Sequence, residues 1–335
     1  MIAFEQASYL AQVRRLRALG LAALERYDLR FKSVRFINHG ENTTFCVTAV
    51  TGQKYLLRIH RHGYHSEEAI LQELRWLTSL AQDRRLQVPS PLRSKAGRFV
   101  ERLSSRGVGQ ARFCCLFRWV EGRFIDKSLR PGHMFELGKT VAVLQKSARH
   151  LASQHRRYWG AEGLLGRRPK FGATDNLQGA TPQQLATLAG ARQKILARLK
   201  RVERAHPEKM GLIHADLHFG NLLLVKDEIG VIDFDDCGYG FYAYDLAVPI
   251  LAAEWVLGET RRAELAAYRS ALVAGYSALA PWTPRDDGLL DDLILTRRLV
   301  MLGWLNTRSD NPRLKARLKR ATAVVVRCVR KRDAG

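Results

Sequence analysis

Alternating apolar and polar residues predict β-strands in the first 120 residues. The runs are SVRFI, TTFCVTAV, KYLLRIH, GRFVERL and ARFCCLFRWV, with TGQK as a turn between the second and third. Their β-branched and aromatic residues favour strands. One helix over residues 66–80 interrupts them, in which Ser66 caps the first turn and Ile70, Leu74 and Leu77 form the apolar face. We expect an antiparallel sheet with a single helix.

After residue 130 the apolar positions take the spacing of helices. FELGKTVAVLQKSARHL repeats apolar residues every three or four positions, and residues 184–205, 259–277 and 287–304 look similar. The chain is therefore predicted to be α+β, with a β-rich N-terminal part and a larger, mostly helical C-terminal part. Residues 156–183, rich in Arg, Gly and Pro, lack this periodicity. They are either an ordered loop or lid over a site, or a surface excursion without a role.

Length and charge limit the class of protein. The 335 residues are enough for two packed units, and 46% of them are hydrophobic, which supports substantial cores. The 55 Lys and Arg outnumber 32 Asp and Glu, so the formal net charge is +23. This charge suits nucleic acid, an anionic membrane surface or a polyphosphate ligand, and charge alone does not choose among them.

Neither a membrane span nor a secretory signal is predicted. No apolar run reaches the roughly 18 residues that cross a bilayer, and Glu5 stands in an N-terminus without an apolar core. The five cysteines are odd in number and show no Cys-x-x-Cys spacing, so neither a disulfide framework nor a zinc site is indicated. We expect a cytoplasmic protein with reduced thiols. The sequence does not indicate an oligomeric state.

Residues 212–236, LIHADLHFGNLLLVKDEIGVIDFDD, place carboxylates beside strand-forming runs. Aspartate is rarely buried unless it is paired or bound to a cation. Phosphoryl transfer from ATP needs a carboxylate facing the acceptor hydroxyl, and oxygen ligands that hold Mg²⁺ on the phosphates. Asp216 follows His214 by two residues, Asn221 follows Asp216 by five and Asp233 follows it by seventeen. This order predicts both parts of such a site.

The motifs HADLHFGN, IDFDD and GFYAYDLA resemble the catalytic loop, the metal-binding segment and the Asp-Leu-Ala element of one family. It is the aminoglycoside phosphotransferase and choline kinase-like family. The resemblance covers most of the chain and implies the bilobal protein kinase-like fold. It implies a nucleotide-binding lobe over residues 1–118, a hinge over 119–123, and a catalytic and substrate-binding lobe over 124–335.

The same resemblance implies the chemistry and its residues. The protein is expected to be an ATP- and Mg²⁺-dependent phosphotransferase with an alcohol group as acceptor. Asp216 would be the catalytic base or the residue that orients the hydroxyl, and Asn221 and Asp233 would bind Mg²⁺. Polar turns without a catalytic role are the structural alternative for these three residues.

A cation and a carboxylate in the N-terminal part support this interpretation. Arg58 lies in the strand YLLRI, and Glu73 follows fifteen residues later on the predicted helix. In kinase folds a strand cation meets the phosphates and a helix carboxylate orients it. The family more often has Lys at this strand position, but Arg also binds phosphate, in a forked geometry. An ordinary surface ion pair is the structural alternative.

Two further segments are weaker candidates for nucleotide contacts. NHGENTTF contains a single glycine, Gly40, and its backbone with Asn42 and Thr43 would face phosphate, unless it is a plain hairpin turn. FCCLFRWVEGR resembles the last strand and the hinge, where backbone groups near Trp119 and Val120 would meet adenine. Trp119 is equally compatible with a core position.

Other polar residues near the motifs have structural explanations. Asp245 is expected to accept backbone hydrogen bonds from the catalytic loop, and His214 to stabilise the same loop. Asp235 and Asp236 would add a metal contact, receive a cationic substrate group or cap the next loop. His218 is a candidate substrate contact.

Three histidines in HRHGYH resemble a metal cluster at first sight. They are His60, His62 and His65. The segment lacks a carboxylate or cysteine complement, so we expect solvated side chains rather than metal ligands.

The acceptor is less well defined than the reaction. Acidic and aromatic residues of the C-terminal helices would form a wall for an amino alcohol or aminoglycoside, unless they are helix starts and core positions: Glu254, Asp286, Asp287, Asp291 and Asp292 with Trp255, Tyr276, Trp282 and Trp304. YLLRIHRHGYHSEEAILQELRWL also resembles the homoserine kinase-like and stress-response kinase branches. Their acceptors are a small amino acid alcohol and protein hydroxyls, respectively, and the sequence does not separate these acceptors.

Two functions from different classes stay open at this point. The first is a small-molecule kinase acting on a hydroxyl, with a protein Ser/Thr kinase of the stress-response type as its variant. The second is a kinase-fold binding protein that uses its basic surface for nucleic acid or acidic lipid. Ten Lys or Arg and two Asp lie between Arg308 and the last residue, which allows the second function. Asp216, Asn221 and Asp233 together favour the first, because a binding protein needs none of them.

Overall fold

The chain divides into two units, each of which packs mainly within itself. The structure is a computed structural model that describes residues 2–83, 86–125, 129–151, 155–225, 228–258 and 261–334. The first unit comprises Met1–Gly122 with Gly230–Asp235, and the second comprises Arg123–Ile229 with Asp236–Gly335. A short segment of the metal-binding motif therefore packs with the N-terminal part of the chain. The lobe and hinge boundaries expected from the sequence stay predictions.

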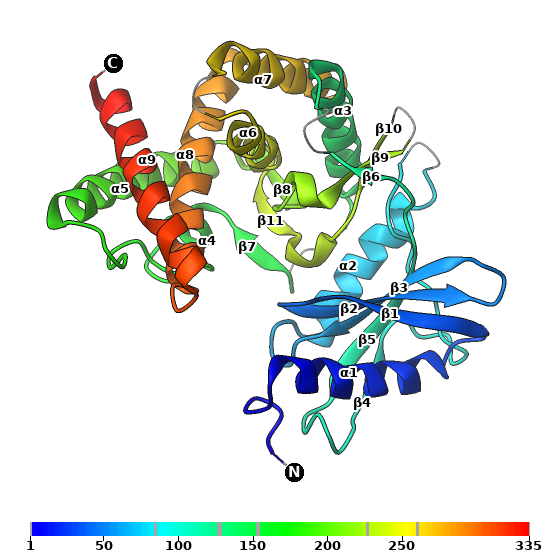
Figure 1. Ribbon diagram of the computed structural model, residues 1–335. Helices are drawn as coiled ribbons and strands as arrows, with labels where there is room; N and C mark the ends of the chain where they lie inside the picture. Colours follow the sequence, from blue (N-terminus) through cyan, green and yellow to red (C-terminus); the bar gives the residue numbers. More distant parts are fainter. Residues whose placement is uncertain are drawn as a thin grey trace. The chain divides into compact units, whose positions relative to one another are not determined.

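The first unit contains a five-stranded antiparallel sheet, which confirms the expected β-rich N-terminal part (Figure 1). Its strands, in spatial order, are β1 (Phe31–His39), β2 (Asn42–Ala49), β3 (Lys54–His60), β5 (Arg112–Arg118) and β4 (Glu101–Leu103). The expected turn after β2 is present, with Gly52 at φ +87°, where a side chain would be strained. The run GRFVERL forms a strand only over β4.

Two helices, not one, belong to the N-terminal part. The expected α2 spans Glu67–Leu80, and its N-cap Ser66 accepts from the backbone N–H of Ala69 at 3.2 Å. The helix α1 (Tyr9–Leu24) was not expected, so the prediction of a single helix was wrong. Its buried residues recur every three or four positions, which is the spacing of an amphipathic helix.

The two faces of the sheet have different partners. Leu57 and Ile59 of β3 belong to the apolar core that Leu16 and Leu19 of α1 share. Successive side chains of a strand point to opposite faces, so Arg58 points away from α1. Strand alternation therefore places the Arg58 side chain on the other face of the sheet, where it meets Glu73 of α2.

The second unit is mostly helical, as expected. Its helices are α3 (Pro131–Ser147), α4 (Ala161–Leu165), α5 (Pro182–Ala205), α6 (Tyr244–Leu257), α7 (Arg262–Ser277), α8 (Pro284–Asn306) and α9 (Pro312–Ala334). Helices expected near residues 137–151, 184–205, 259–277 and 287–304 are confirmed as α3, α5, α7 and α8, although residues 259–260 lie outside the described residues. Together with the sheet, these helices confirm the α+β class.

Two small sheets carry the motif segments. One contains β6 (Arg123–Phe124), β9 (Leu222–Val225) and β10 (Glu228–Val231), and the other contains β7 (Arg157–Trp159), β11 (Gly238–Phe241) and β8 (Met210–Ile213). Short 3₁₀ turns lie at Pro207–Lys209, Phe219–Asn221 and Phe234–Asp236. β7 and α4 fall within the segment 156–183, so part of that expected loop is regular structure.

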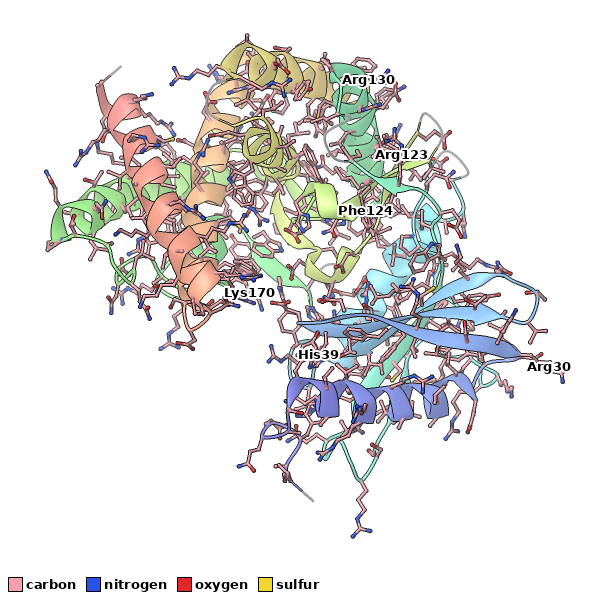
Figure 2. The ribbon with its side chains drawn as sticks, in the orientation of Figure 1. Arg30, His39, Arg123, Phe124, Arg130 and Lys170 are labelled. Atoms are coloured by element: carbon pink, nitrogen blue, oxygen red, sulfur yellow. The ribbon has the colours of Figure 1, made fainter. Side chains whose placement is uncertain are left out.

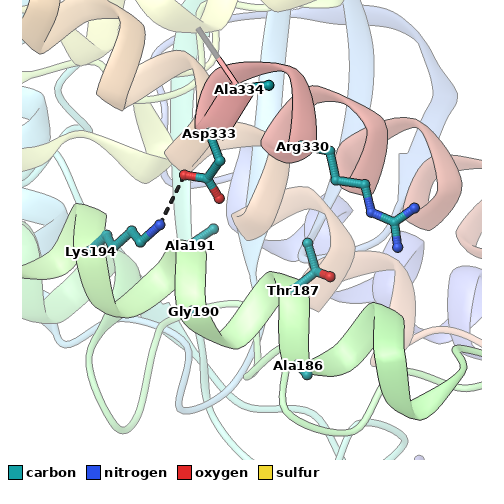
Figure 3. A pocket seen from close by; sticks show the side chains of 8 residues that line it. All are labelled: Ala186, Thr187, Gly190, Ala191, Lys194, Arg330, Asp333 and Ala334. Atoms are coloured by element: carbon teal, nitrogen blue, oxygen red, sulfur yellow. Dashed lines mark hydrogen bonds and ion pairs between the residues drawn. The ribbon is translucent and has the colours of Figure 1, made fainter.

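The basic C-terminal segment is the helix α9. Its buried residues Leu318, Val325 and Val329 lie on one side, and α9 packs against α5 and α8 (Figure 1). A hollow between α5 and α9 is crossed by the ion pair of Lys194 and Asp333 at 2.9 Å (Figure 3). None of its lining residues is a predicted site residue. Among the described residues, no helix combines the length and the apolar character that a membrane crossing requires.

Glycine permits the close approach of α3 and α7. A Cβ at Gly138 of α3 would overlap the carbonyl oxygen of Leu272 and lie 2.6 Å from the backbone nitrogen of Tyr276. A Cβ at Gly275 of α7 would overlap the carbonyl oxygen of Phe135. The backbones of these two helices are therefore in contact at two reciprocal positions.

We predict that Gly138→Ala lowers the free energy of unfolding by about 2 kcal/mol, because backbone atoms cannot move aside for the new methyl group. The matched control is Gly190→Ala within α5, where nothing lies within 4 Å of the added Cβ. It is expected to stabilise the protein by about 0.5–1 kcal/mol through helix propensity. Urea denaturation measures both values, and equal effects of the two variants would contradict the packing argument.

Candidate active site

Arg58 and Glu73 form a buried ion pair in the first unit. Arg58 Nη1 donates to Glu73 Oε1 at 2.6 Å, and the two side chains are 3% and 0% exposed. The Arg58 guanidinium also lies over the ring of Phe117, 4.8 Å from its centroid. The alternative of an ordinary surface pair is therefore wrong. Burial opposes the charge of Arg58, but Glu73, Asp235 and Asp233 outweigh it and raise the pKa of Arg58 above its usual value.

Asp233 lies in a tight turn of the same unit. Its φ of +63° is a left-handed conformation, which Asp tolerates better than most residues. Val231 donates its backbone N–H to Gln87 O at 2.9 Å just before the turn. Arg58 Nη2 lies 3.7 Å from Asp233 Oδ1, yet the Asp233 side chain remains 55% exposed. The carboxylate is oriented by Arg58 and still accessible.

Asp235 is surrounded by three basic side chains. Its Oδ1 lies 3.4 Å from His65 Nε2, 3.7 Å from Arg58 Nη1 and 3.8 Å from His60 Nδ1. Burial raises the pKa of Asp235, but these neighbours, led by His65, hold it well below its usual range. The cluster connects the β3–α2 segment to the turn at Asp233.

The expectation of solvated histidines is wrong for two of the three. The side chains of His60 and His65 are 1% and 4% exposed, because both contact Asp235. Only His62 is exposed, with Nδ1 3.4 Å from the carbonyl oxygen of Ala111. A group of three metal-ligating side chains is not found in the described part of the chain. The carboxylate that contacts His60 and His65 belongs to Asp235, which lies far from them in the sequence.

In the second unit, Asp245 stabilises the loop that carries Asp216. The backbone N–H groups of His214 and Ala215 donate to Asp245 at 3.0 and 2.7 Å. Asp245 is fully buried, and Ala215 takes a left-handed φ of +68°. The backbone N–H of Asp216 lies 3.3 Å from His214 Nδ1. The structural roles expected for Asp245 and His214 are confirmed.

Asp216 is partly exposed and has contacts on both carboxylate oxygens. Arg297 Nη2 donates to Oδ1 at 2.6 Å, while Asn221 Nδ2 and His218 Nε2 each lie 3.4 Å from Oδ2. Asn221 Nδ2 also donates to the carbonyl oxygen of Asp216 at 2.9 Å. Burial raises the pKa of Asp216, but Arg297 and His218 outweigh it and keep the pKa well below the usual value. Asp216 is therefore ionised at neutral pH.

Arg297 was missed in the sequence. It lies in α8 with its side chain 8% exposed, and Nη1 donates to the hydroxyl of Tyr244 at 3.4 Å. The signal was available, since LILTRRLVML places two arginines inside an apolar helical run. Charged residues are almost never fully buried unless they are paired, so such an arginine indicates a carboxylate partner. The sequence could not indicate which one.

The two predicted metal ligands offer oxygen atoms of the right kind. Asn221 uses Nδ2 toward Asp216, which leaves Oδ1 of the amide as its acceptor atom. Asp233 presents an accessible carboxylate. Amide and carboxylate oxygens suit hard divalent cations such as Mg²⁺. Asn221 belongs to the second unit and Asp233 to the first, so their shared binding of one ion stays a prediction.

The remaining nucleotide-contact residues lie in the first unit. Gly40 is in the β1–β2 turn, and its N–H donates to Asn42 O at 2.9 Å. The Thr43 hydroxyl lies 2.6 Å from Nδ1 of His39, which is labelled in Figure 2, so this side chain already has a partner. Trp119 and Val120 follow β5 and are half-buried. Their contacts with phosphate and adenine stay predictions.

The acidic residues of the C-terminal helices have partners within the chain. Glu254 pairs with Arg298, Asp286 with Lys209, Asp287 with Trp282, Asp291 with Arg269, and Asp292 with Arg198 and Arg332. Asp286 also caps the start of α8 by accepting from the Thr283 N–H at 2.8 Å. The structural explanation of helix starts and ion pairs therefore accounts for them.

The antiparallel sheet with its buried Arg–Glu pair, and the helical unit with its stabilised Asp-x-x-x-x-Asn loop, define a phosphotransferase of the protein kinase-like fold. The chain belongs to the phosphotransferase enzyme family known as APH, whose match spans residues 33–282.

Curated relatives and solved structures agree with this class. Amicoumacin kinase of Bacillus subtilis (strain 168) is 24% identical, with 86% of this chain and 84% of the relative covered. A homoserine kinase of Methylobacterium nodulans is 27% identical, with 79% and 78% covered. The structure of a microcompartment-associated aminopropanol kinase has a TM-score of 0.81 at 27% identity, covering 94% of this chain and 97% of that one. Amicoumacin kinase hAmiN, solved with AMP-PNP, Ca²⁺ and Ami, has a TM-score of 0.79 at 22% identity, covering 92% of each chain.

The buried carboxyl group of Asp245 should make the free energy of unfolding depend on pH. Burial raises the pKa of Asp245 from its usual 3.8 to about 6, although its backbone hydrogen bonds lower it. The folded state binds the proton of the Asp245 carboxyl group more tightly than the unfolded state does, so protonation of Asp245 stabilises the fold. This stabilisation is fully present below the unfolded pKa and is lost as the pH rises through about 6. The stability of the wild type relative to Asp245→Asn should fall by up to about 3 kcal/mol from pH 4 to pH 7. Urea denaturation over this pH range measures it.

Asp286→Asn is the control, because the stability that Asp286 contributes should change with pH in the opposite direction. Burial raises the pKa of Asp286, but Lys209 and Thr283 outweigh burial and lower this pKa. The stability that the ionised Asp286 contributes is therefore lost as the pH falls. A wild-type advantage over Asp245→Asn that does not change with pH would contradict the raised pKa.

Proposed function

We propose that this protein transfers the γ-phosphoryl group of ATP, with Mg²⁺, to a hydroxyl group of a small molecule. The observation that carries the proposal is the state of Asp216: an ionised, partly exposed carboxylate on a loop whose backbone is tied to buried Asp245. A solvated turn without a catalytic role would need neither Asp245 as a buried acceptor nor Arg297 as a buried partner. Family membership supports the same reaction class.

In the proposed reaction Asp216 receives the hydrogen bond of the acceptor hydroxyl and takes its proton. The hydroxyl oxygen forms a bond to the γ-phosphorus, the bond to the bridging oxygen of ADP breaks, and ADP leaves with the electron pair. Asp216 contributes by orienting the attacking oxygen rather than by forming a covalent bond. The loop geometry fixes where its carboxylate stands before the acceptor arrives.

Arg58 would stabilise the negative charge of the phosphates, with Glu73 fixing its orientation. Its guanidinium is charged at any physiological pH and has donors left after the contact with Glu73. Asn221 and Asp233 would supply oxygens to Mg²⁺, which neutralises phosphate charge when bound. The complex of hAmiN with AMP-PNP and Ca²⁺ supports the use of a nucleotide and a divalent cation by this chain.

The acceptor is proposed to be a small alcohol, and the names of the relatives suggest the candidates to test. They are an amino alcohol, as for the aminopropanol kinase, homoserine, and amicoumacin. Because the acidic residues of the C-terminal helices already pair within the chain, a polycationic aminoglycoside has less support. A protein hydroxyl remains the alternative acceptor. The test is a screen of these acceptors with ATP and Mg²⁺, read out by ADP release.

We predict that Asp216→Asn lowers kcat at least about 100-fold with the best acceptor of this screen, since general-base catalysis and orientation are both lost. Nucleotide affinity should change little, because the substitution leaves the first unit unaltered. The matched control is Asp291→Asn, an exposed carboxylate paired with Arg269. If Asp216→Asn retains full activity while the nucleotide still binds, the proposed role of Asp216 is wrong.

Asn221→Ala and Asp233→Ala should weaken nucleotide binding only when the divalent cation is present. Removal of an oxygen ligand costs affinity for the metal and for the metal–nucleotide complex. Titration calorimetry with AMP-PNP, with and without Mg²⁺, measures the difference. Thermal denaturation without nucleotide separates this effect from loss of folding. Equal Mg²⁺ enhancement of AMP-PNP affinity in the wild type and both variants would contradict the metal assignment.

A further inference from the structure

We propose that Arg297 is a positioning residue, which fixes Asp216 so that one carboxylate oxygen faces the acceptor hydroxyl. The inference rests on the proposed function and extends it to a residue outside the loop that carries His214, Asp216 and Asn221. Arg297 comes from α8, about 80 residues along the chain, and its nearest contact is the Asp216 carboxylate at 2.6 Å.

The two oxygens of Asp216 are not equivalent. Oδ1 accepts from Arg297 at 2.6 Å, which is the length of a strong, charge-assisted hydrogen bond. Oδ2 lies 3.4 Å from both Asn221 Nδ2 and His218 Nε2, which is longer than a typical N–H···O bond. The Asp216 side chain is 24% exposed, and its longer contacts hold Oδ2 less tightly than Arg297 holds Oδ1. Arg297 thus occupies one oxygen and leaves the other for the hydroxyl.

Arg297 is well placed for this role because it has little freedom itself. Its side chain is 8% exposed, and Nη1 donates to the Tyr244 hydroxyl at 3.4 Å while Nη2 contacts Asp216. One short hydrogen bond to Asp216 and a longer one to Tyr244 therefore restrict the planar guanidinium, and a lysine cannot reproduce this fork. α8 is a helix of 23 residues, and a side chain on a long helix is located more sharply than one on a loop.

The next residue provides a matched control. Arg298 lies on the same helix with its side chain 12% exposed, and it pairs with Glu254. Arg297 is buried and Arg298 nearly so, each pairs with one carboxylate, and removal of either leaves that carboxylate without its arginine. They differ in that only Arg297 contacts Asp216.

The experiment compares Arg297→Gln, Arg297→Lys and Arg298→Gln in steady-state kinetics with the acceptor found by the screen. Arg297→Gln should lower kcat about 100-fold and Arg297→Lys about tenfold, since a misplaced catalytic group loses rate in this range. The KM for ATP should stay within about twofold in both, because only the step that needs oriented Asp216 is affected. Arg298→Gln should keep wild-type kcat. Melting temperatures of all three identify a variant that fails to fold, and Arg297→Lys keeps the test open if the Gln variant unfolds.

A double substitution separates positioning from a general structural role. If Arg297 acts through the carboxylate, Arg297→Gln should lower kcat by no more than about twofold in an Asp216→Asn background. A loss as large as in the wild-type background would overturn the inference, as would equal losses in the Arg297 and Arg298 variants. Failure of the proposed function has a different signature, because the wild type itself would then release no ADP with any acceptor.

Discussion

Two backbone N–H groups that donate to one buried carboxylate are the interaction on which the catalytic loop depends. Asp245 accepts from His214 and Ala215 at 3.0 and 2.7 Å. Without this acceptor, two donors would be buried at the end of β8 with no strand to receive them, at a cost of about 1–3 kcal/mol each. Because the bonds are to adjacent residues, they fix both the position and the direction of the chain just before Asp216. Ala215 takes a left-handed φ of +68°, which costs free energy for a residue with a Cβ, and its bond to Asp245 offsets this cost.

Buried charge is distributed differently in the two units. In the first, one arginine contacts three carboxylates, of which Glu73 is fully buried and Asp233 is half exposed. The carboxylates near Arg58 therefore outnumber it, and His60 and His65 also lie beside Asp235. In the second unit, Arg297 serves a single carboxylate, Asp216. The two buried arginines differ in their surroundings: Arg58 lies among three carboxylates, and Arg297 pairs with one.

Parts of the fold were predictable because they depend on local periodicity. The strands around Arg58 alternate in polarity, and α2, α3, α5 and α8 repeat apolar residues at helical spacing. α1 was missed although the apolar residues of YLAQVRRLRALGLAAL recur at helical spacing and its arginines lie outside the buried face. His60 and His65 were judged by the segment HRHGYH alone, which contains no carboxylate. Their partner Asp235 is about 170 residues away, and no local pattern encodes that contact.

The sequence by itself determined the phosphotransferase class and predicted Asp216, Asn221 and Asp233 as its site residues, since phosphoryl transfer needs such side chains in a fixed order within a short loop and the following strand. It also predicted Arg58 and Glu73 as a pair through the resemblance to kinase folds, and the structure confirms that the two side chains form a buried ion pair. Tertiary structure alone decided the partners of the charged groups: Arg297 on Asp216, the histidines on Asp235 and the helix arginines on the acidic residues. The physical reason is that a buried charge must meet an opposite charge, and which one it meets depends on packing between segments far apart in the chain.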